Sequence, residues 1–412
     1  MRQTALFVSL FASLPLAGCS GTPSRSAPAG PTGPVQLTVV DVSGAPFPGA
    51  SVKIDGVVLQ TDARGQVQSA SVPARYDVTL ATPDRKHAYV YEGLTGRAPT
   101  LRLEQLATAW KYVKIHVGVA PAGVLIVAAV AGSTARQATV AAHPDGTDLT
   151  LGWAGAEPSP TVLLTALHYT ADPVTHAPTH YDGIASSSQP VADGASITWV
   201  PAFAPPTFGE HTVRVRVGDP GVTGVQLDML VSAPADAAPF ELRLPVLALD
   251  AGETAMLVPE LPAARLDLAI VGVLTEERYA TYIARDVGAS RDPIDVTFSP
   301  TVSALLPEKD AKGFGPGDTL AWSAPPGEVV RVRLFDAGGT GAPDITPITT
   351  ASEDTLPALD DVGITLPRGG VYAWMVEASS TVGTVDDVGA NRYQGVRGAD
   401  VAGTQQREFT LR

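Results

Sequence analysis

The chain of 412 residues has 42 acidic and 28 basic side chains, a formal net charge of −14, and 45% hydrophobic residues. This length and apolar content suffice for two to four domains with separate cores, which excludes a wholly disordered chain. The negative charge would repel a polyphosphate backbone, so no nucleic acid is expected as a partner. With 40 Gly and 36 Pro, long helices are excluded, because interior Pro costs a helix about 3 kcal/mol and Gly about 1 kcal/mol. We therefore expect an all-β fold.

Residues 1–18 predict a lipoprotein signal peptide. Arg2 is followed by an apolar stretch, residues 5–14, which is too short to span a bilayer. The following Leu-Ala-Gly-Cys run ends at Cys19 and resembles a bacterial lipobox. The resemblance implies cleavage before Cys19, a diacylglycerol on its thiol and usually a further acyl chain on its amino group. Two or more acyl chains hold a protein stably at a membrane. The alternative is an ordinary secretory signal with an incidental cysteine.

Residues 19–34 contain the lipidated Cys19 and a Pro/Gly/Ser-rich stretch that predicts a disordered tether. Because Cys19 is the only cysteine, the domains cannot have an intrachain disulfide. Ser20 after the lipobox cysteine implies sorting to the outer membrane. We therefore expect a protein of the cell envelope, lipid-anchored in the outer membrane of a Gram-negative bacterium.

Residues 35–104 are expected to form the first β-sandwich. Apolar and polar residues alternate at 35–39, 52–54 and 76–80, as in half-buried strands, and Gly65 suits a turn with positive φ. This pattern, with Pro48-Gly49, resembles the carboxypeptidase regulatory-like, or transthyretin-like, domain. The resemblance implies a seven-stranded accessory or spacer sandwich without catalytic residues. Some related surface modules contain a Lys–Asn isopeptide crosslink, which is excluded within this domain because the only asparagine is Asn391.

Residues 105–310 contain further strands separated by Gly/Pro/Asp loops, which favours antiparallel sandwiches. The expected strands are 112–119, 124–131, 161–169, 211–218, 225–232, 240–249 and 266–274. The region is either one domain or two, 105–218 and 219–310, with a break near 218–221. The segment 275–287 could form a short helix or a strand. No repeat is strict enough to predict a solenoid.

Residues 311–412 follow a polar hinge at 307–310 and predict the last sandwich. Val330, Val332 and Leu334 alternate with Arg331 and Arg333, and a closing strand is expected at 407–411. The Tyr-x-Trp-x-Val-x-Ala strand that contains Trp374, together with Trp322, resembles a fibronectin type III or related immunoglobulin-like domain. Both tryptophans are expected to pack in the core rather than to form a ligand platform.

The strongest candidate for chemistry is a histidine-rich segment that includes Asp172. Imidazole and carboxylate groups bind transition metals, so the segment predicts a metal site. Its candidate ligands are His168, His176, His180 and Asp182. Pro173 and Pro178 disrupt a helix here, and the alternative is a solvated, irregular loop. No other cofactor is expected.

No enzyme signature is found, and no catalytic residue is predicted. The chain contains no Gly-x-Ser-x-Gly elbow, no Walker motif and no dinucleotide fingerprint. Paired carboxylates at Asp360-Asp361 and Asp386-Asp387 could hold calcium, but neither has EF-hand spacing, and surface charge is the simpler interpretation.

The sequence thus favours a lipid-anchored envelope protein in which tandem β-sandwich modules have a non-enzymatic binding, adhesion or structural role. Its partners would be the membrane, through the lipid, and an envelope protein or glycan that contacts loops on the sandwiches. One alternative is a metal-binding protein or metal-dependent hydrolase centred on His168, His176 and His180. Another is an accessory subunit of an envelope transport or secretion assembly.

Overall fold

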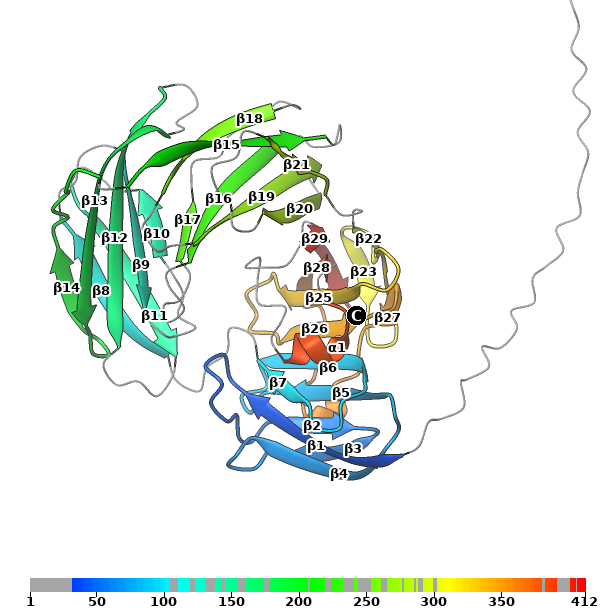
Figure 1. The fold of residues 1–412 in the computed structure, drawn as a ribbon. Coiled ribbons are helices and arrows are strands. Elements are labelled where there is room, and N and C mark those ends of the chain that lie inside the picture. The colour runs from blue at the N-terminus through cyan, green and yellow to red at the C-terminus, as the bar shows by residue number, and fades with distance from the viewer. Residues whose placement is uncertain are drawn as a thin grey trace, which may run out of the picture.

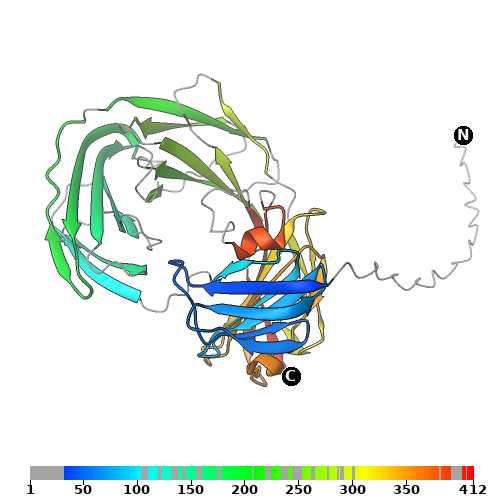
Figure 2. The same ribbon diagram turned by 60° about the horizontal axis from the view of Figure 1, so that its bottom comes forward.

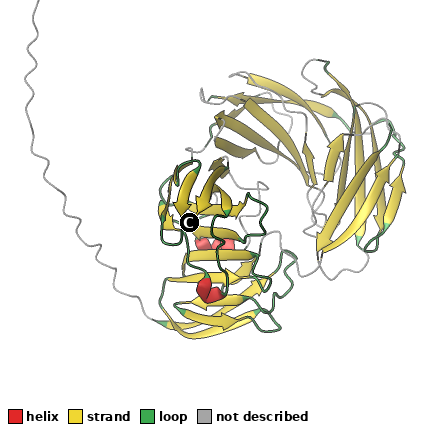
Figure 3. Cartoon of the chain, turned by 180° about the vertical axis from the view of Figure 1, so that it is seen from behind, coloured by secondary structure: helices red, strands yellow, loops and turns green. Residues whose placement is uncertain are grey.

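A computed structural model describes residues 32–103, 110–118, 123–130, 138–141, 145–154, 160–173, 178–206, 208–218, 224–232, 240–243, 253–260, 265–275, 278–284, 287, 292–298, 302–379, 382–390, 401–404 and 406–412. These residues form mostly strands (Figure 3), which confirms the expected tandem β-sandwich architecture. The helical elements are the 3-10 helix η1 (Asp360–Val362) and the helix α1 (Val385–Gly389). Neither is long enough to cross a membrane, and no other described segment is a helix that could.

Module 1 is a seven-stranded, two-layer sandwich. Its strands are β1 (Gly33–Val40), β2 (Ser51–Ile54), β3 (Val57–Gln60), β4 (Gln66–Val72), β5 (Tyr76–Ala81), β6 (His87–Leu94) and β7 (Thr100–Arg102). The layers have the orders β4-β1-β7 and β3-β2-β5-β6, and β1 is parallel to β7. Gly65 has the expected positive φ, 70°, and a Cβ there would lie 2.3 Å from the Val39 carbonyl oxygen. Seven strands in two layers agree with the transthyretin-like resemblance, although membership in that family stays a prediction.

Modules 2 and 3 repeat the strand order of module 1. Module 2 contains β8 (Trp110–Val117), β9 (Val124–Val130), β10 (Ala138–Ala141), β11 (Thr147–Ala154), β12 (Thr161–Ala171), β13 (Pro178–Pro190) and β14 (Ser196–Trp199). Module 3 contains β15 (Glu210–Val217), β16 (Gly224–Ser232), β17 (Phe240–Arg243), β18 (Glu253–Pro259), β19 (Arg265–Thr275), β20 (Arg278–Ala284) and β21 (Ile294–Val296). The layers are β11-β8-β14 with β10-β9-β12-β13, and β18-β15-β21 with β17-β16-β19-β20. In both modules the first strand is again parallel to the seventh.

The strand pairing also shows what segment 275–287 forms and with which strands β15 pairs, two points that the sequence pattern did not decide. The segment 275–287 contains a strand, because β20 pairs with β19 on one side and with β29 on the other. The strand β15, which the expected break near 218–221 assigned to the preceding unit, pairs with β18 and β21. The change from strands that pair within module 2 to strands that pair within module 3 therefore lies between Trp199 and Glu210.

Module 4 is a sandwich of a different topology. Its strands are β22 (Ser303–Leu306), β23 (Ala311–Phe314), β24 (Thr319–Ser323), β25 (Val329–Asp336), β26 (Asp344–Thr349), β27 (Glu353–Thr355), β28 (Val371–Ser379), β29 (Val401–Thr404) and β30 (Arg407–Leu411). One layer is β22-β24-β27, so β22 belongs here although it precedes the expected hinge. In the other layer β26, β25 and β28 are followed by β29 and β30. Trp322 and Trp374 are both buried in the core, as predicted.

The alternation in β25 holds, but one of its arginines is not a surface residue. Arg331 is 6% exposed, and its Nε donates to Glu377 Oε2 at 2.8 Å. Val329, two residues earlier on the same face, belongs to an apolar core that also contains Val385 and Val388 of α1. This face is therefore covered, and the arginine is paired because an isolated buried charge is strongly destabilising.

One continuous sheet of 14 strands links modules 3, 4 and 1. The strand β20 pairs with β29, and β26 runs parallel to β6. We call modules 1 and 4 together the base, and modules 2 and 3 together, residues 110–298, the arch. Figures 1 and 2 show the first and last modules side by side, with the arch curving away from them.

The contact between modules 1 and 4, which we call the seam, is polar at its rim and apolar inside. Five residue pairs align along β6 and β26, from His87 with Asp344 to Tyr91 with Ile348. Val382, Val385, Val388 and Val329 of module 4 belong to the core of module 1. Gly389 packs so closely that a Cβ there would lie 2.7 Å from Leu101 Cδ2. The two modules thus share a core.

Hydrogen bonds from α1 and η1 fix the rim of the seam. Asp386 accepts from the Thr95 and Gly96 amides, both at 3.0 Å, and from the Thr95 hydroxyl at 2.8 Å. Asp361 Oδ2 lies 2.6 Å from Lys53 Nζ. One aspartate of each Asp-Asp pair, Asp386 in α1 and Asp361 in η1, therefore contacts module 1.

Candidate functional site

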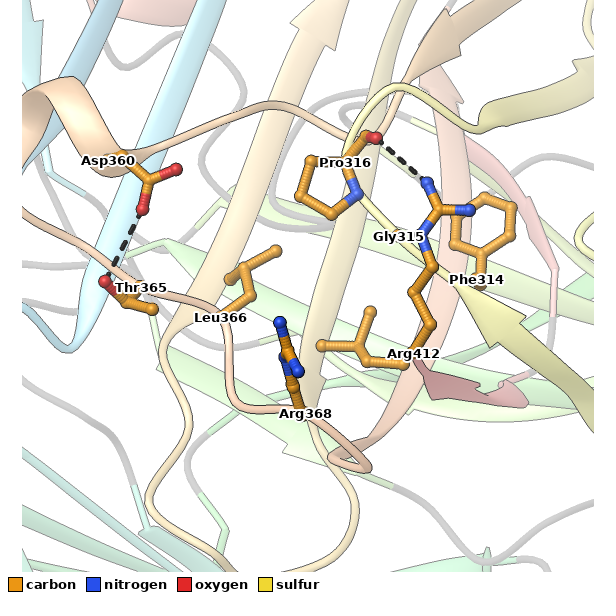
Figure 4. Close-up of a pocket in the computed structure, with 9 residues that line it drawn as sticks. Phe314, Gly315, Pro316, Asp360, Thr365, Leu366, Arg368 and Arg412 are labelled. Atoms are coloured by element: carbon orange, nitrogen blue, oxygen red, sulfur yellow. Dashed lines mark hydrogen bonds between the residues drawn. The ribbon is translucent and has the colours of Figure 1, made fainter.

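The candidate site is a groove of about 550 Å³ on module 4, shown in Figure 4. It is lined by Phe314, Gly315, Pro316, Asp360, Thr365, Leu366, Arg368, Leu411 and Arg412. Small-molecule sites typically enclose about 300–1,000 Å³, so the groove is large enough for a small ligand.

Strands β23 and β30 form the apolar side of the groove. They pair in parallel, and this pairing ends with Phe314 beside Leu411. The Phe314 ring packs edge-on against Phe409, with centroids 5.0 Å apart, and Phe409 stacks on Tyr372 at 5.9 Å. These contacts hold Phe314 in place before any ligand arrives.

The opposite side of the groove depends on module 1. Asp360 begins η1, and the carbonyl oxygen of Val362 in that helix accepts from Arg85 Nη1 at 2.7 Å. The same guanidinium nitrogen donates to Ser51 Oγ at 2.8 Å. Gly363 ends η1 with φ 81°, a conformation that favours glycine. The seam therefore positions one wall of the groove.

The polar residues of the groove divide into two groups, which face each other in Figure 4. Asp360 accepts a long hydrogen bond, 3.5 Å, from the Thr365 hydroxyl. Across from them, Arg412 donates to the Pro316 carbonyl oxygen at 3.5 Å and lies 3.3 Å from the Asp318 carboxylate. Arg368 is exposed and, among the described residues, has no hydrogen-bond or ion-pair partner.

These side chains suit ligand binding. The lining contains no histidine, cysteine or serine, and its one hydroxyl, on Thr365, makes only a long hydrogen bond to Asp360. It offers guanidinium donors, a carboxylate acceptor, a hydroxyl and an apolar floor. A few placed polar groups above apolar side chains are typical of ligand sites.

The described parts of the histidine-rich segment lie mostly on two antiparallel strands, β12 and β13. His168 lies on β12, and His180 and Asp182 lie on β13. The pairing shifts register between His168 and Tyr169, so Asp182 occupies a β-bulge. His176 lies outside the described residues.

Each described member of this segment has its own partner. His180 Nδ1 lies 3.0 Å from Glu210 Oε1, and this carboxylate raises the pKa of His180. Asp182 accepts from the Thr170 hydroxyl at 2.9 Å, and the His168 ring packs against Phe203. No group of three metal-ligating side chains occurs among the residues that the structure describes. The metal site stays a prediction.

A carboxyl pair in the base was not found from the sequence. Glu92 on β6 lies beside Asp354 on β27 and Thr349 on β26. Burial, reinforced by the Asp354 charge, raises the pKa of Glu92 to about 7. Burial also raises the pKa of Asp354. The pair joins modules 1 and 4, so its ionisation is linked to the stability of the seam.

The sequence also did not reveal the groove residues. Phe314, Thr365 and Arg368 belong to no recognisable motif and meet only because β23, β30 and the segment 360–368 converge.

No known protein family matches the sequence, and no curated protein matches it either. Three solved structures resemble parts of the chain. A candidate adhesin from Bacteroides ovatus is 8% identical, with a TM-score of 0.16, over 47% of this chain and 91% of that one. The Bacillus anthracis TIE protein is 10% identical, with a TM-score of 0.17, over 64% of this chain and half of that one. A streptococcal ancillary pilin is 10% identical, with a TM-score of 0.15, over 64% of this chain and 98% of that one. At this similarity, the tandem-sandwich assignment rests on the chain's own sheets.

Proposed function

We propose that this protein is a lipid-anchored cell-envelope protein with a non-enzymatic binding, adhesion or structural role. Acyl chains on Cys19 would hold it at the membrane, the base would follow the tether, and the arch would be displayed from the base. Residues 19–31, which include Cys19 and most of the predicted tether, lie outside the described residues, whereas Gly33 and Pro34 at its predicted end begin β1. The lipobox resemblance supports the role of Cys19.

The observation that supports this proposal is the pairing of the first and last modules through β6 and β26. Because of it, β1, which follows the tether in sequence, and the groove lie in one packed unit. A ligand bound in the groove would then be held by the unit that the tether joins to the membrane, while the arch remains available for a larger partner.

Fractionation of cells that produce the full chain or the Cys19→Ser variant tests the anchor. We expect the full chain in the membrane fraction and the variant in the soluble fraction or retained as uncleaved precursor. Surface protease digestion and crosslinking of intact cells then identify exposure and partners. A Cys19→Ser variant that is processed and membrane-bound like the full chain would contradict lipid anchoring.

A further inference from the structure

We propose that the groove on module 4 binds a carboxylate-bearing saccharide, with Arg368 as the residue that receives the carboxylate. This inference names a ligand class for the base and rests on the proposed binding role, but it does not require the lipid anchor.

Arg368 has the chemistry and the freedom to bind a carboxylate. Guanidinium presents a planar fork of N–H donors that matches a carboxylate, and such charged pairs are stronger than neutral hydrogen bonds. Arg412 is partly neutralised by Asp318, 3.3 Å away, whereas Arg368 has no described partner. Arg368 is therefore the positively charged side chain of the groove that is available to pair with a carboxylate of a ligand.

Asp360 and Thr365, which precede Arg368 on the same segment, select against a second negative charge at their end of the groove. Asp360 contributes a carboxylate, and Thr365 contributes a hydroxyl only 3.5 Å from it. A carboxylate repels anions but accepts hydrogen bonds from hydroxyl groups. The groove is thus complementary to a ligand that is anionic at one end and rich in hydroxyls at the other.

The floor of the groove suits a sugar ring. Phe314 is held by Phe409, and Pro316, Leu366 and Leu411 supply further apolar surface. The C–H faces of a pyranose can pack on such side chains while its hydroxyls and carboxylate reach the two walls. An inorganic anion would use Arg368 but would make no favourable contact with the apolar floor or with Asp360.

The test is a ligand titration of the purified full chain in detergent, followed by NMR. The acidic probes are trigalacturonate, a hyaluronan tetrasaccharide, sialyllactose and N-acetylmuramate. The neutral probes are galactotriose and lactose, and the competitors are sulfate and acetyl-diglycine. We expect at least one acidic saccharide to bind, the neutral sugars not to bind, and the competitors to displace the saccharide only weakly.

Two variants and a matched control locate the site. Arg368→Gln should weaken binding by roughly 10- to 100-fold, the range for losing a charge-assisted hydrogen bond, and Arg368→Lys should weaken it less. Arg64 is an exposed arginine of module 1 outside the groove, so Arg64→Gln should leave binding unchanged. Because Arg368 is exposed and pairs with no residue that the structure describes, its replacement should not affect folding.

Several results would overturn the inference. These are binding of none of the acidic probes, equal binding of neutral sugars, equal displacement by sulfate or by the peptide carboxylate, and full affinity in Arg368→Gln. All of these can occur with Cys19 lipidated and the protein at the envelope. Failure of this inference is therefore distinguishable from failure of the anchoring proposal.

Discussion

The base and the arch both consist of two-layer β modules, but their modules are joined in different ways. In the arch, consecutive modules meet where Tyr181 of β13 is buried against module 3, with its hydroxyl 3.0 Å from the Leu257 carbonyl oxygen. In the base, the two ends of the chain meet, and Asp386 binds an amide 291 residues away. The arch junction thus combines this buried aromatic with Glu210, which accepts from the Tyr181 amide and contacts His180, whereas the seam also has strand pairing and a shared apolar core.

The largest expected effect is on the arch junction. Tyr181→Ala should lower the free energy of unfolding by about 3 kcal/mol or more, because it leaves a cavity and removes the hydrogen bond to Leu257. Hydrogen exchange measured by mass spectrometry should show faster exchange in β15 and β18 and little change at the seam. The exposed Tyr112, 49% accessible, is the control, and Tyr112→Ala should change stability by less than about 0.5 kcal/mol. If Tyr181→Ala and Tyr112→Ala lowered the free energy of unfolding equally, Tyr181 would not hold modules 2 and 3 together.

The next largest loss of stability is expected when a large side chain is introduced into the seam. Gly389→Leu should cost about 1–3 kcal/mol, because its side chain would have to displace Leu101 of module 1. Faster exchange should appear in β6 and β26 while the arch stays protected. Gly383 lies on the same segment with no atom within 4 Å of a built Cβ, so Gly383→Leu should be neutral. If Gly389→Leu loosened the arch instead, the separation between the two junctions would be wrong.

A smaller effect is expected at the polar rim. Asp386→Asn should cost about 1 kcal/mol, because the three hydrogen bonds lose their charged acceptor. Asp361→Asn should cost less, since Asp361 is 62% exposed and such ion pairs contribute little. Chemical denaturation of both variants, monitored in module 1, measures the difference. The reverse order would show that the amide contacts of Asp386 do not hold the rim.

The last expected effect is a pH dependence of the seam. The pKa of Glu92 is about 7 in the folded chain, above its ordinary value of 4.5. Between these two pH values the folded chain therefore holds a proton that the unfolded chain releases. Stability should therefore fall as the pH rises from 4.5 to about 7 and then level off. Glu92→Gln should flatten this part of the profile of melting temperature against pH. The control is Glu353→Gln, because Glu353 is exposed and lies on the same strand as Asp354, and this variant should keep the wild-type profile. An unchanged slope in Glu92→Gln would show that ionisation of Glu92 does not affect stability.

Much of the fold was predictable because strand alternation is local. The expected strand 211–218 is β15 (Glu210–Val217), and the expected strand 225–232 is β16 (Gly224–Ser232). Burial of Trp322 and Trp374 also followed from alternation. The candidate groove was not predictable, because Phe314, Asp360 and Arg412 come from segments that meet only after the sheets form.

The sequence by itself determined that this is an all-β chain of tandem sandwiches, because the frequency of Gly and Pro and the period-two alternation act over a few residues. Only the tertiary structure decided that β26 pairs with β6, that Asp386 clamps Thr95 and that Arg331 is buried. These features depend on which surfaces cover one another across hundreds of residues. An aspartate that reads as surface charge becomes a structural clamp once another module supplies the amides.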